Sequence, residues 1–187
     1  MTTSRDSLLL AATAFLLTSF CLTPHQASAQ ARPALTLPMP GIQTFRPVTT
    51  TVALGGNASP GAMPALKRAG FDVVIAVRED GEEGYDRQAE ERAATAAGLR
   101  FIAIPFTRLN PDPAAARKFL EVMAAPENAY AFIYCHTGPR VATMWLIKRV
   151  RQDGWTFDRA MAEAESLGLT RPELKQFAKE FLAASNR

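Results

Sequence analysis

The sequence predicts a three-layer α/β/α fold around a mostly parallel sheet of four to five strands. Short apolar segments of strand length alternate along the chain with longer segments of helical pattern. Strands that alternate with helices form parallel sheets, which helices cover on both faces. The chain has 187 residues, of which 48% are hydrophobic and 21% charged. It is therefore long and apolar enough to bury the core of one such domain.

The domain begins with a strand, a helix and a second strand. Thr51–Gly55 is a short apolar segment. Ser59-Pro60 predicts a helix start, with Ser as the N-cap and Pro at the first helical position, and Gly70 ends that helix. Phe71–Val77 is a continuous apolar run, which is typical of a strand buried on both faces. An acidic loop, Arg78–Glu83, follows this strand.

The third and fourth predicted strands are separated by another helix. An Ala-rich helix ends before Gly98, and Leu99–Ile104 is the third apolar segment. Asp112-Pro113 again combines a cap with a proline, so it predicts the start of a helix that runs to about Ala125. Ala131–Tyr134 is the fourth predicted strand.

Three further helices complete the predicted domain. Arg140–Gln152 has a helical pattern, and Gly154 ends it. The next two helices are predicted at residues 157–167 and 171–184, and Thr170–Glu173 forms a capping box with a proline inside it. We interpret the apolar positions of these helices, Trp145 among them, as core.

The N-terminus has the pattern of an export signal. Leu8–Phe20 is an apolar run of 13 residues, shorter than the roughly 20 residues that span a bilayer. Ala27-Ser28-Ala29 then supplies a cleavage motif of small residues. We therefore expect an exported, periplasmic protein, cleaved near Ala29 and without a stable membrane anchor afterwards. The predicted parts are a signal peptide (1–29), a Pro-rich extended arm (30–48) and the α/β domain (49–187).

Cysteine, histidine and charge exclude several classes of function. The processed chain keeps one cysteine and one histidine, Cys135 and His136. This excludes a disulfide framework and a metal site of several Cys or His ligands. The formal net charge is +3, and the 21 Lys and Arg residues are scattered along the chain, so nucleic acid is not an expected partner. An unpaired thiol in an oxidising compartment indicates either a function or an inert core cysteine.

Candidate chemistry lies in the segment Tyr134–Arg140. A strand that ends in Cys135, followed by a turn with Gly138 and a helix that begins near Arg140, has the pattern of an anion-binding loop. The backbone N–H groups of such a turn carry partial positive charge, which favours a thiolate nucleophile at the cysteine. The guanidinium of the arginine offers two donors to a tetrahedral oxyanion. We predict Cys135 and Arg140 as catalytic residues, and His136, Thr137 and Gly138 as phosphate-binding residues.

Several motifs in order resemble a bacterial phosphatase-like domain that occurs alone or joined to beta-lactamase-like hydrolases. The motifs cover about residues 45–170 and are Leu54-Gly-Gly, Leu66-Lys-Arg-Ala-Gly-Phe-Asp-Val-Val-Ile, Arg78-Glu-Asp-Gly-Glu, Ile104-Pro-Phe and Cys135-His-Thr-Gly-Pro-Arg-Val-Ala-Thr-Met-Trp. The resemblance implies the dual-specificity, cysteine phosphatase-like fold. It also implies that Cys135 is the nucleophile and Arg140 the oxyanion clamp. The expected substrate is a phosphorylated small molecule or protein, and thiolate chemistry at phosphorus implies no metal and no organic cofactor.

Three departures from larger cysteine phosphatases predict weak activity. Pro139 has no N–H, so the loop has one donor fewer. Val141 replaces a hydroxyl residue that helps to release the intermediate, which predicts slow turnover or accumulation of a phospho-cysteine. The general acid is open: Asp112, Asp80 and Glu82 are candidates, and so is the absence of any such acid.

Other interpretations of the same residues remain at this stage. The segment Tyr134–Arg140, with the pattern Tyr-Cys-x-x-Gly-x-Arg, resembles the loop of rhodanese-like sulfurtransferases, in which Cys135 would form a persulfide. A non-catalytic oxyanion-binding module is a third hypothesis. We expect the His136 side chain to point outward, and Arg78 either adds charge to the pocket or pairs with the acidic residues that follow it.

Overall fold

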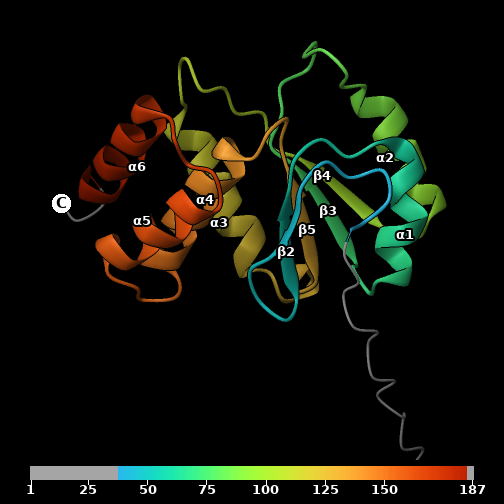
Figure 1. The fold of residues 1–187 in the computed structure, drawn as a ribbon, viewed down its shortest axis with the longest axis horizontal. Helices are drawn as coiled ribbons and strands as arrows, with labels where there is room; N and C mark the ends of the chain where they lie inside the picture. The colour runs from blue at the N-terminus through green and yellow to red at the C-terminus, as the bar shows by residue number, and fades with distance from the viewer. Residues whose placement is uncertain (1–37, 185–187) are drawn as a thin grey trace, which may run out of the picture. The chain divides into compact units, whose positions relative to one another are not determined.

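Five strands form one mixed sheet in the computed structural model, which describes residues 38–184 (Figure 1). The sheet has the order β1-β2-β5-β3-β4. Strand β1 is antiparallel to β2, and the other neighbours are parallel. The predicted α/β fold with a mostly parallel sheet is therefore confirmed. The strands are β1 (Phe45–Pro47), β2 (Val52–Gly55), β3 (Val73–Ala76), β4 (Arg100–Ala103) and β5 (Ala131–Tyr134).

Strand β1 lies within the predicted extended arm. The sequence gives no alternating pattern there, and the strand has only three residues. Its conformation depends on pairing with β2 and on ring contacts, since Phe45 stacks on Phe132 at 5.7 Å between centroids. Pro47 is tolerated because this strand is at the edge of the sheet. The predicted signal peptide and the first residues of the arm lie outside the described residues.

Six α-helices in the described residues cover the two faces of the sheet (Figure 1). Helices α1 and α2 lie on one face, and α3 to α6 lie on the other. The side chains of Asp86, Asp112 and Thr156 each accept a hydrogen bond at the N-terminus of a helix, and of these the sequence predicted Asp112. Ser59, the other predicted cap, makes no such bond and is followed by a short 3-10 helix, Pro60–Ala62, before α1. The helices are α1 (Met63–Arg68), α2 (Arg87–Ala96), α3 (Pro113–Ala124), α4 (Pro139–Arg151), α5 (Phe157–Ser166) and α6 (Pro172–Ala184).

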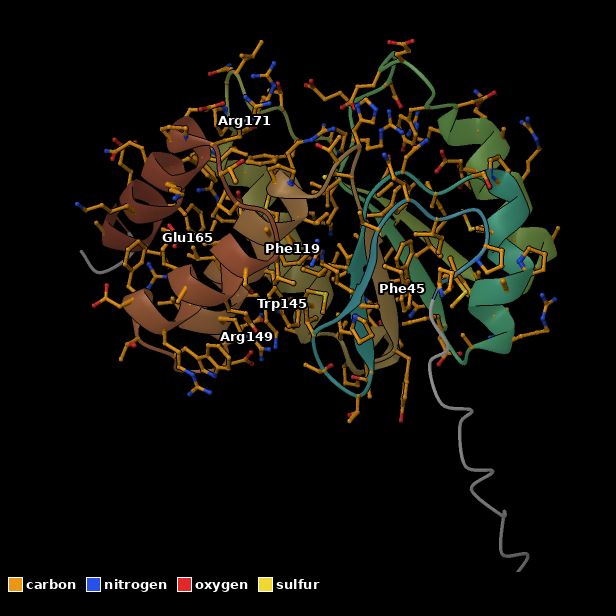
Figure 2. The ribbon with its side chains drawn as sticks, viewed as in Figure 1. Phe45, Phe119, Trp145, Arg149, Glu165 and Arg171 are labelled. Carbon is orange, nitrogen blue, oxygen red and sulfur yellow. The ribbon has the colours of Figure 1, made fainter. Side chains whose placement is uncertain are left out.

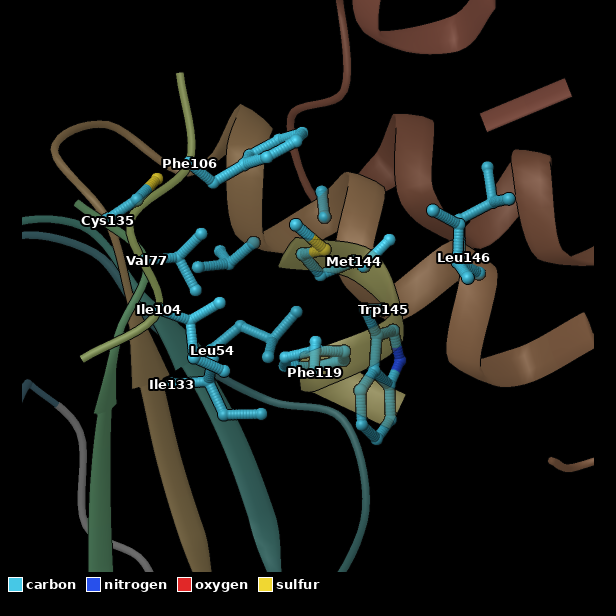
Figure 3. Packing of buried hydrophobic residues seen from close by; sticks show 14 of the residues in the cluster. Leu54, Val77, Ile104, Phe106, Phe119, Ile133, Cys135, Met144, Trp145 and Leu146 are labelled. Atoms are coloured by element: carbon cyan, nitrogen blue, oxygen red, sulfur yellow. The ribbon is translucent and has the colours of Figure 1, made fainter. Parts of the chain in front are cut away.

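Each strand sends alternate side chains into two separate cores. In β5, Phe132 and Tyr134 pack in the cluster with α1 and α2, while Ile133 and then Cys135 pack in the cluster with α3 to α6. Figure 3 shows Cys135 at the edge of this second cluster. The alternation follows from the two-residue period of a strand. It decides on which face of the sheet each residue at a strand end will lie.

The larger core is organised around helix α4. Trp145 is fully buried there and donates from Nε1 to Glu163 of α5 at 3.1 Å, which confirms its interpretation as core. Arg149 binds the same carboxylate and stacks on the ring of Trp145 at 4.6 Å (Figure 2).

Within residues 38–184, no helix has the length and apolar character needed to cross a membrane.

Candidate active site

Cys135 lies between the carboxyl end of β5 and the N-terminus of α4. Its side chain is 1% exposed. The backbone N–H of Gly138 donates to Cys135 Sγ at 3.2 Å. Gly138 has φ = +113°, a conformation that L residues with a side chain rarely adopt, so glycine is required where the loop turns into the helix. The sulfur therefore lies at the positive end of a helix of 13 residues.

Three of the five N–H groups of Arg140 donate to oxygens of Glu82 and Phe106, and its side chain also makes a hydrogen bond with Cys135. Nη1 donates to Glu82 Oε1 and to the carbonyl of Phe106 at 2.9 Å, and Nη2 donates to Glu82 Oε2 at 2.7 Å. The carboxylate thus binds the end of the guanidinium. The remaining N–H groups, on Nε and Nη2, share one edge. This edge is a complete fork for two oxygens of a tetrahedral anion.

Arg140 and Glu82 stabilise each other's charged form. Burial lowers the pKa of Arg140, but the hydrogen bonds of its side chain with Glu82 and Cys135 more than offset this, so its pKa lies above its ordinary value. Burial would raise the pKa of Glu82, yet the hydrogen bond from Arg140 and the backbone N–H of Glu79 hold it at about 2. The guanidinium and the carboxylate both stay ionised at neutral pH.

The three carboxylates predicted as general acids have other contacts. Asp80 pairs with Arg87 at 2.9 Å. Asp112 accepts a hydrogen bond from the N–H of Ala114 at 2.7 Å, as the N-cap of α3. Glu82 does line the cavity beside the loop, but it is ionised and bound by Arg140. None of the three therefore offers a carboxyl group without a bound partner to the cavity beside the Cys135–Arg140 loop.

Arg78 is fully buried and does not line the cavity. Its Nε donates to Glu82 Oε2 at 3.1 Å, and its Nη1 donates to Asn57 Oδ1 at 2.5 Å. Its guanidinium stacks on the ring of Tyr85 at 4.8 Å. Of the two interpretations, the ion pair with the acidic loop is confirmed. The reason is the two-residue period of β3, which places this side chain on the face of α1 and α2, opposite to Cys135.

The Cys135–Arg140 loop is held by a neighbouring strand as well. The N–H of Asn57 donates to the carbonyl of His136 at 2.9 Å. Gly56 precedes it, and a Cβ there would come within 2.5 Å of the carbonyl of Gln43. The glycine pair after β2 therefore permits close approach of three backbone segments. Asn57 also accepts a hydrogen bond from Arg78, and Arg78 binds Glu82, which holds Arg140. Buried Arg78 is therefore connected both to the loop and to Arg140.

A cavity of about 370 Å³ lies beside the loop. His136 and Thr137 line it with exposed side chains, as expected for His136, and Arg140 lines it too. Several of its other residues were not predicted, because they come from loops that meet only in the folded chain and no motif marks them. The unpredicted lining residues are Glu79, Thr107, Arg108, Leu109, Arg171 and Leu174.

Tyr134 and Val141 flank the loop without contributing a polar group to it. Tyr134 lies on the opposite face of the sheet from Cys135, and its hydroxyl donates to Glu90 Oε2 of α2. Val141 is 1% exposed and packs in the same cluster as Cys135.

In the part of the chain that the structure describes, no group of three or more His, Cys, Asp or Glu residues could hold a metal ion.

The comparison with protein families identifies a phosphatase-like domain. The family model described as beta-lactamase hydrolase-like protein, phosphatase-like domain, matches residues 44–152. The match runs from β1 through α4 and includes the whole loop. The chain belongs to this family, and the resemblance seen in the sequence is confirmed.

Solved structures of phosphatases share the fold. A DUF442 phosphatase-family protein from Shewanella putrefaciens CN-32 has a TM-score of 0.66 at 20% identity, over 77% of this chain and 92% of that chain. The core catalytic domain of the PP-IP phosphatase SIW14 from S. cerevisiae has a TM-score of 0.62 at 16% identity, over 77% and 93%. A phosphatase-family protein from Neisseria meningitidis Z2491 has a TM-score of 0.61 at 18% identity, over 73% and 96%. No curated protein sequence matches the chain.

Proposed function

We propose that the protein is a cysteine-dependent phosphatase that hydrolyses phosphate monoesters through Cys135. The observation that carries the proposal is the hydrogen bond from the Gly138 N–H to Cys135 Sγ at the N-terminus of α4. A donor and a helix dipole directed at sulfur favour the thiolate, which is the nucleophilic form. The phosphatase-like family and fold support the same chemistry.

Arg140 and the loop backbone bind the phosphoryl group in this proposal. The free edge of the Arg140 guanidinium binds two oxygens, and the backbone N–H groups of His136, Thr137 and Gly138 face the same anion. Pro139 contributes no donor. Glu82 is a positioning residue, because it binds the end of the guanidinium and leaves the edge free.

The reaction has two displacement steps. In the first, the Cys135 thiolate attacks phosphorus, the S–P bond forms and the P–O bond to the leaving group breaks. The leaving oxygen keeps the electron pair and takes a proton from water. In the second, water attacks phosphorus, the S–P bond breaks, and inorganic phosphate leaves as the thiolate returns.

The sulfurtransferase hypothesis rests on the six-residue Cys135–Arg140 loop and on Tyr134 before it. The Tyr134 side chain lies on the opposite face of the sheet with its hydroxyl bound to Glu90, so only the loop still supports this hypothesis. The binding-module hypothesis rests on Val141, which has no hydroxyl to assist release, and on the open identity of the general acid. One experiment distinguishes both hypotheses from the proposed phosphatase.

The test is the intact mass of acid-quenched protein after exposure to an aryl phosphate or to thiosulfate. We expect a phosphoryl adduct on the wild type and none on Cys135→Ser, with Arg140→Lys as a variant that forms the adduct more slowly. A dithiothreitol-sensitive sulfur adduct after thiosulfate would indicate a sulfurtransferase instead. Tight phosphate binding with neither an adduct nor turnover would indicate a binding module.

We also infer export of the processed domain, on the apolar run and the cleavage motif of the N-terminus. N-terminal sequencing of protein recovered from the periplasm should begin at Gln30. Recovery of uncleaved chain from the cytoplasm would contradict this.

A further inference from the structure

The cavity beside Arg140 is larger than one phosphoryl group needs. Its volume of about 370 Å³ is in the range of pockets that bind small organic ligands, roughly 300–1,000 Å³. His136, Thr137, Pro139 and Arg140 of the Cys135–Arg140 loop form part of its lining. The remaining walls come from the loops after β3 and β4 and from the start of α6. A substrate whose phosphoryl group is bound by the loop would have its other atoms beside these walls.

Two exposed arginines, Arg108 and Arg171, line the cavity near the start of α6. Arg171 precedes α6, is exposed, and its side chain makes no hydrogen bond or ion pair in the part of the chain that the structure describes (Figure 2). Arg108 is half exposed, and its only ion pair within residues 38–184 is with Glu173, at 3.7 Å. That contact places Arg108 beside the start of α6, next to Arg171. The two guanidinium groups form one cationic wall.

A carboxylate also lines the cavity. Glu79 lies in the loop after β3 and lines the cavity, and its carboxylate has no ion pair in the described chain. Glu82 adds no net negative charge, since Arg140 and Arg78 both bind it. A molecule in the cavity therefore meets two arginines on the α6 side, of which Arg108 is loosely paired with Glu173, and the carboxylate of Glu79 on the β3 side. The net charge of the two arginines and Glu173 is positive, so a second anionic group on the substrate is attracted to them and repelled by Glu79.

We infer that the site takes a small phosphate monoester that carries a second anionic group, a phosphate or a carboxylate, which Arg108 and Arg171 bind. The inference rests on the proposed function, because it assigns the rest of the substrate to the same site. Leu109, 79% exposed at the mouth of the cavity, supplies an apolar contact for the body of the molecule. The volume of the cavity favours a small molecule over a protein segment.

The test compares two substrates that differ only in charge, 3-carboxyphenyl phosphate and its neutral analogue 3-carbamoylphenyl phosphate. We expect the processed wild-type protein to prefer the carboxylate by about fivefold in kcat/KM at low salt, the size of one or two exposed charge pairs. The preference should fall to about twofold in Arg171→Gln and disappear in the double variant Arg108→Gln/Arg171→Gln. It should also fall as salt is raised, because exposed charges are screened.

The matched control is Arg92→Gln, which removes an exposed arginine of α2 outside the cavity. Its preference should equal that of the wild type. A ratio near one in the wild type, with hydrolysis of both substrates lost in Cys135→Ser, would overturn this inference and leave the proposed function standing. Equal rates in wild type and Cys135→Ser would overturn the proposed function. Higher kcat/KM for an acidic phosphopeptide than for either aryl phosphate would also overturn the inference.

Discussion

At the scale of single residues, the orientation of the Arg140 guanidinium depends on Glu82. The carboxylate binds the end of the guanidinium, so the edge with Nε remains for the phosphoryl group. We expect Glu82→Gln to lower kcat/KM by about 10- to 100-fold, since small displacements of a clamping group are costly. The inhibition constant of vanadate should rise in parallel, and the thermal midpoint should fall less than in a core variant. Unchanged vanadate affinity would contradict the positioning role.

The pH dependence of Glu82 follows from its low pKa. Its folded-state pKa of about 2 lies below the ordinary 4.5, so its stabilising effect is full above about pH 4.5 and is lost as the pH falls toward 2. It adds no step to the activity profile between pH 5 and 8. This separates it from a general acid, which would add such a step.

We expect the leaving group to receive no proton from the three carboxylates predicted as acids. Asp80 and Asp112 are bound elsewhere, and Glu82 is ionised. We expect kcat to fall steeply as the leaving group becomes more basic, and Asp80→Asn or Asp112→Asn to change kcat by less than about twofold. A loss of about 100-fold in either variant, confined to basic leaving groups, would identify that residue as the acid.

We attribute the expected slow release of phosphate from Cys135 to Val141. It packs beside Cys135 and has no hydroxyl to stabilise the returning thiolate. We expect a pre-steady-state burst in the wild type and a smaller burst with faster steady-state turnover in Val141→Thr. The buried hydroxyl would cost about 1–3 kcal/mol of stability if it found no partner. Equal burst and steady-state rates in the wild type would contradict an accumulating intermediate.

At the scale of structural elements, Arg78 connects the end of β3 with the catalytic loop. It binds Glu82, which holds the clamp, and Asn57, whose N–H binds the carbonyl of His136. Arg78→Met should raise the inhibition constant of vanadate and lower kcat/KM by about 10-fold or more. Arg78→Lys should restore part of the loss. Both should be compared with Arg87→Met, which removes an exposed arginine paired with the same acidic loop.

A second variant keeps this prediction testable if Arg78→Met does not fold, because breaking a buried ion pair costs about 3–5 kcal/mol. Asn57→Ala removes only the side-chain link to Arg78 and keeps the backbone N–H. We expect the same direction of change in vanadate affinity, with a smaller loss of stability. No change in either variant would mean that Arg78 only fills the core.

At the scale of the whole molecule, the buried carboxyl group of Glu90 makes stability depend on pH. Burial raises its pKa from 4.5 to about 7, so between these values the unfolded chain is ionised while the folded chain keeps the proton. The free energy of unfolding therefore falls as the pH rises from about 4.5 to 7, by roughly 3 kcal/mol at most. Glu90→Gln should lose this slope, as measured by urea unfolding at pH 5 and pH 8.

The control for this measurement is Glu91→Gln, an exposed neighbour on the same helix. It should keep the slope of the wild type. Parallel pH profiles for wild type and Glu90→Gln would show that this carboxyl group does not remain protonated in the fold.

Much of the fold could be predicted from the sequence because it rests on periodic patterns and local signals. The continuous apolar run of β3, the helix start at Asp112 and the glycine stops are properties of neighbouring residues. Strand order and the antiparallel pairing of β1 could not be predicted in this way. They depend on contacts between segments that are distant in the chain.

In the candidate site, too, the contiguous residues could be predicted from the sequence and the contacts between distant segments could not. The sequence by itself determined that a cysteine, a turn with glycine and an arginine follow a buried strand, because these residues are contiguous. Only the tertiary structure decided that Glu82 holds Arg140, that Arg78 faces the opposite side of the sheet, and that Arg108 and Arg171 share a wall. The physical reason is that parallel strands end at one edge of the sheet, where their loops converge. The conformations of those loops follow no period, so which side chains meet there is decided by folding alone.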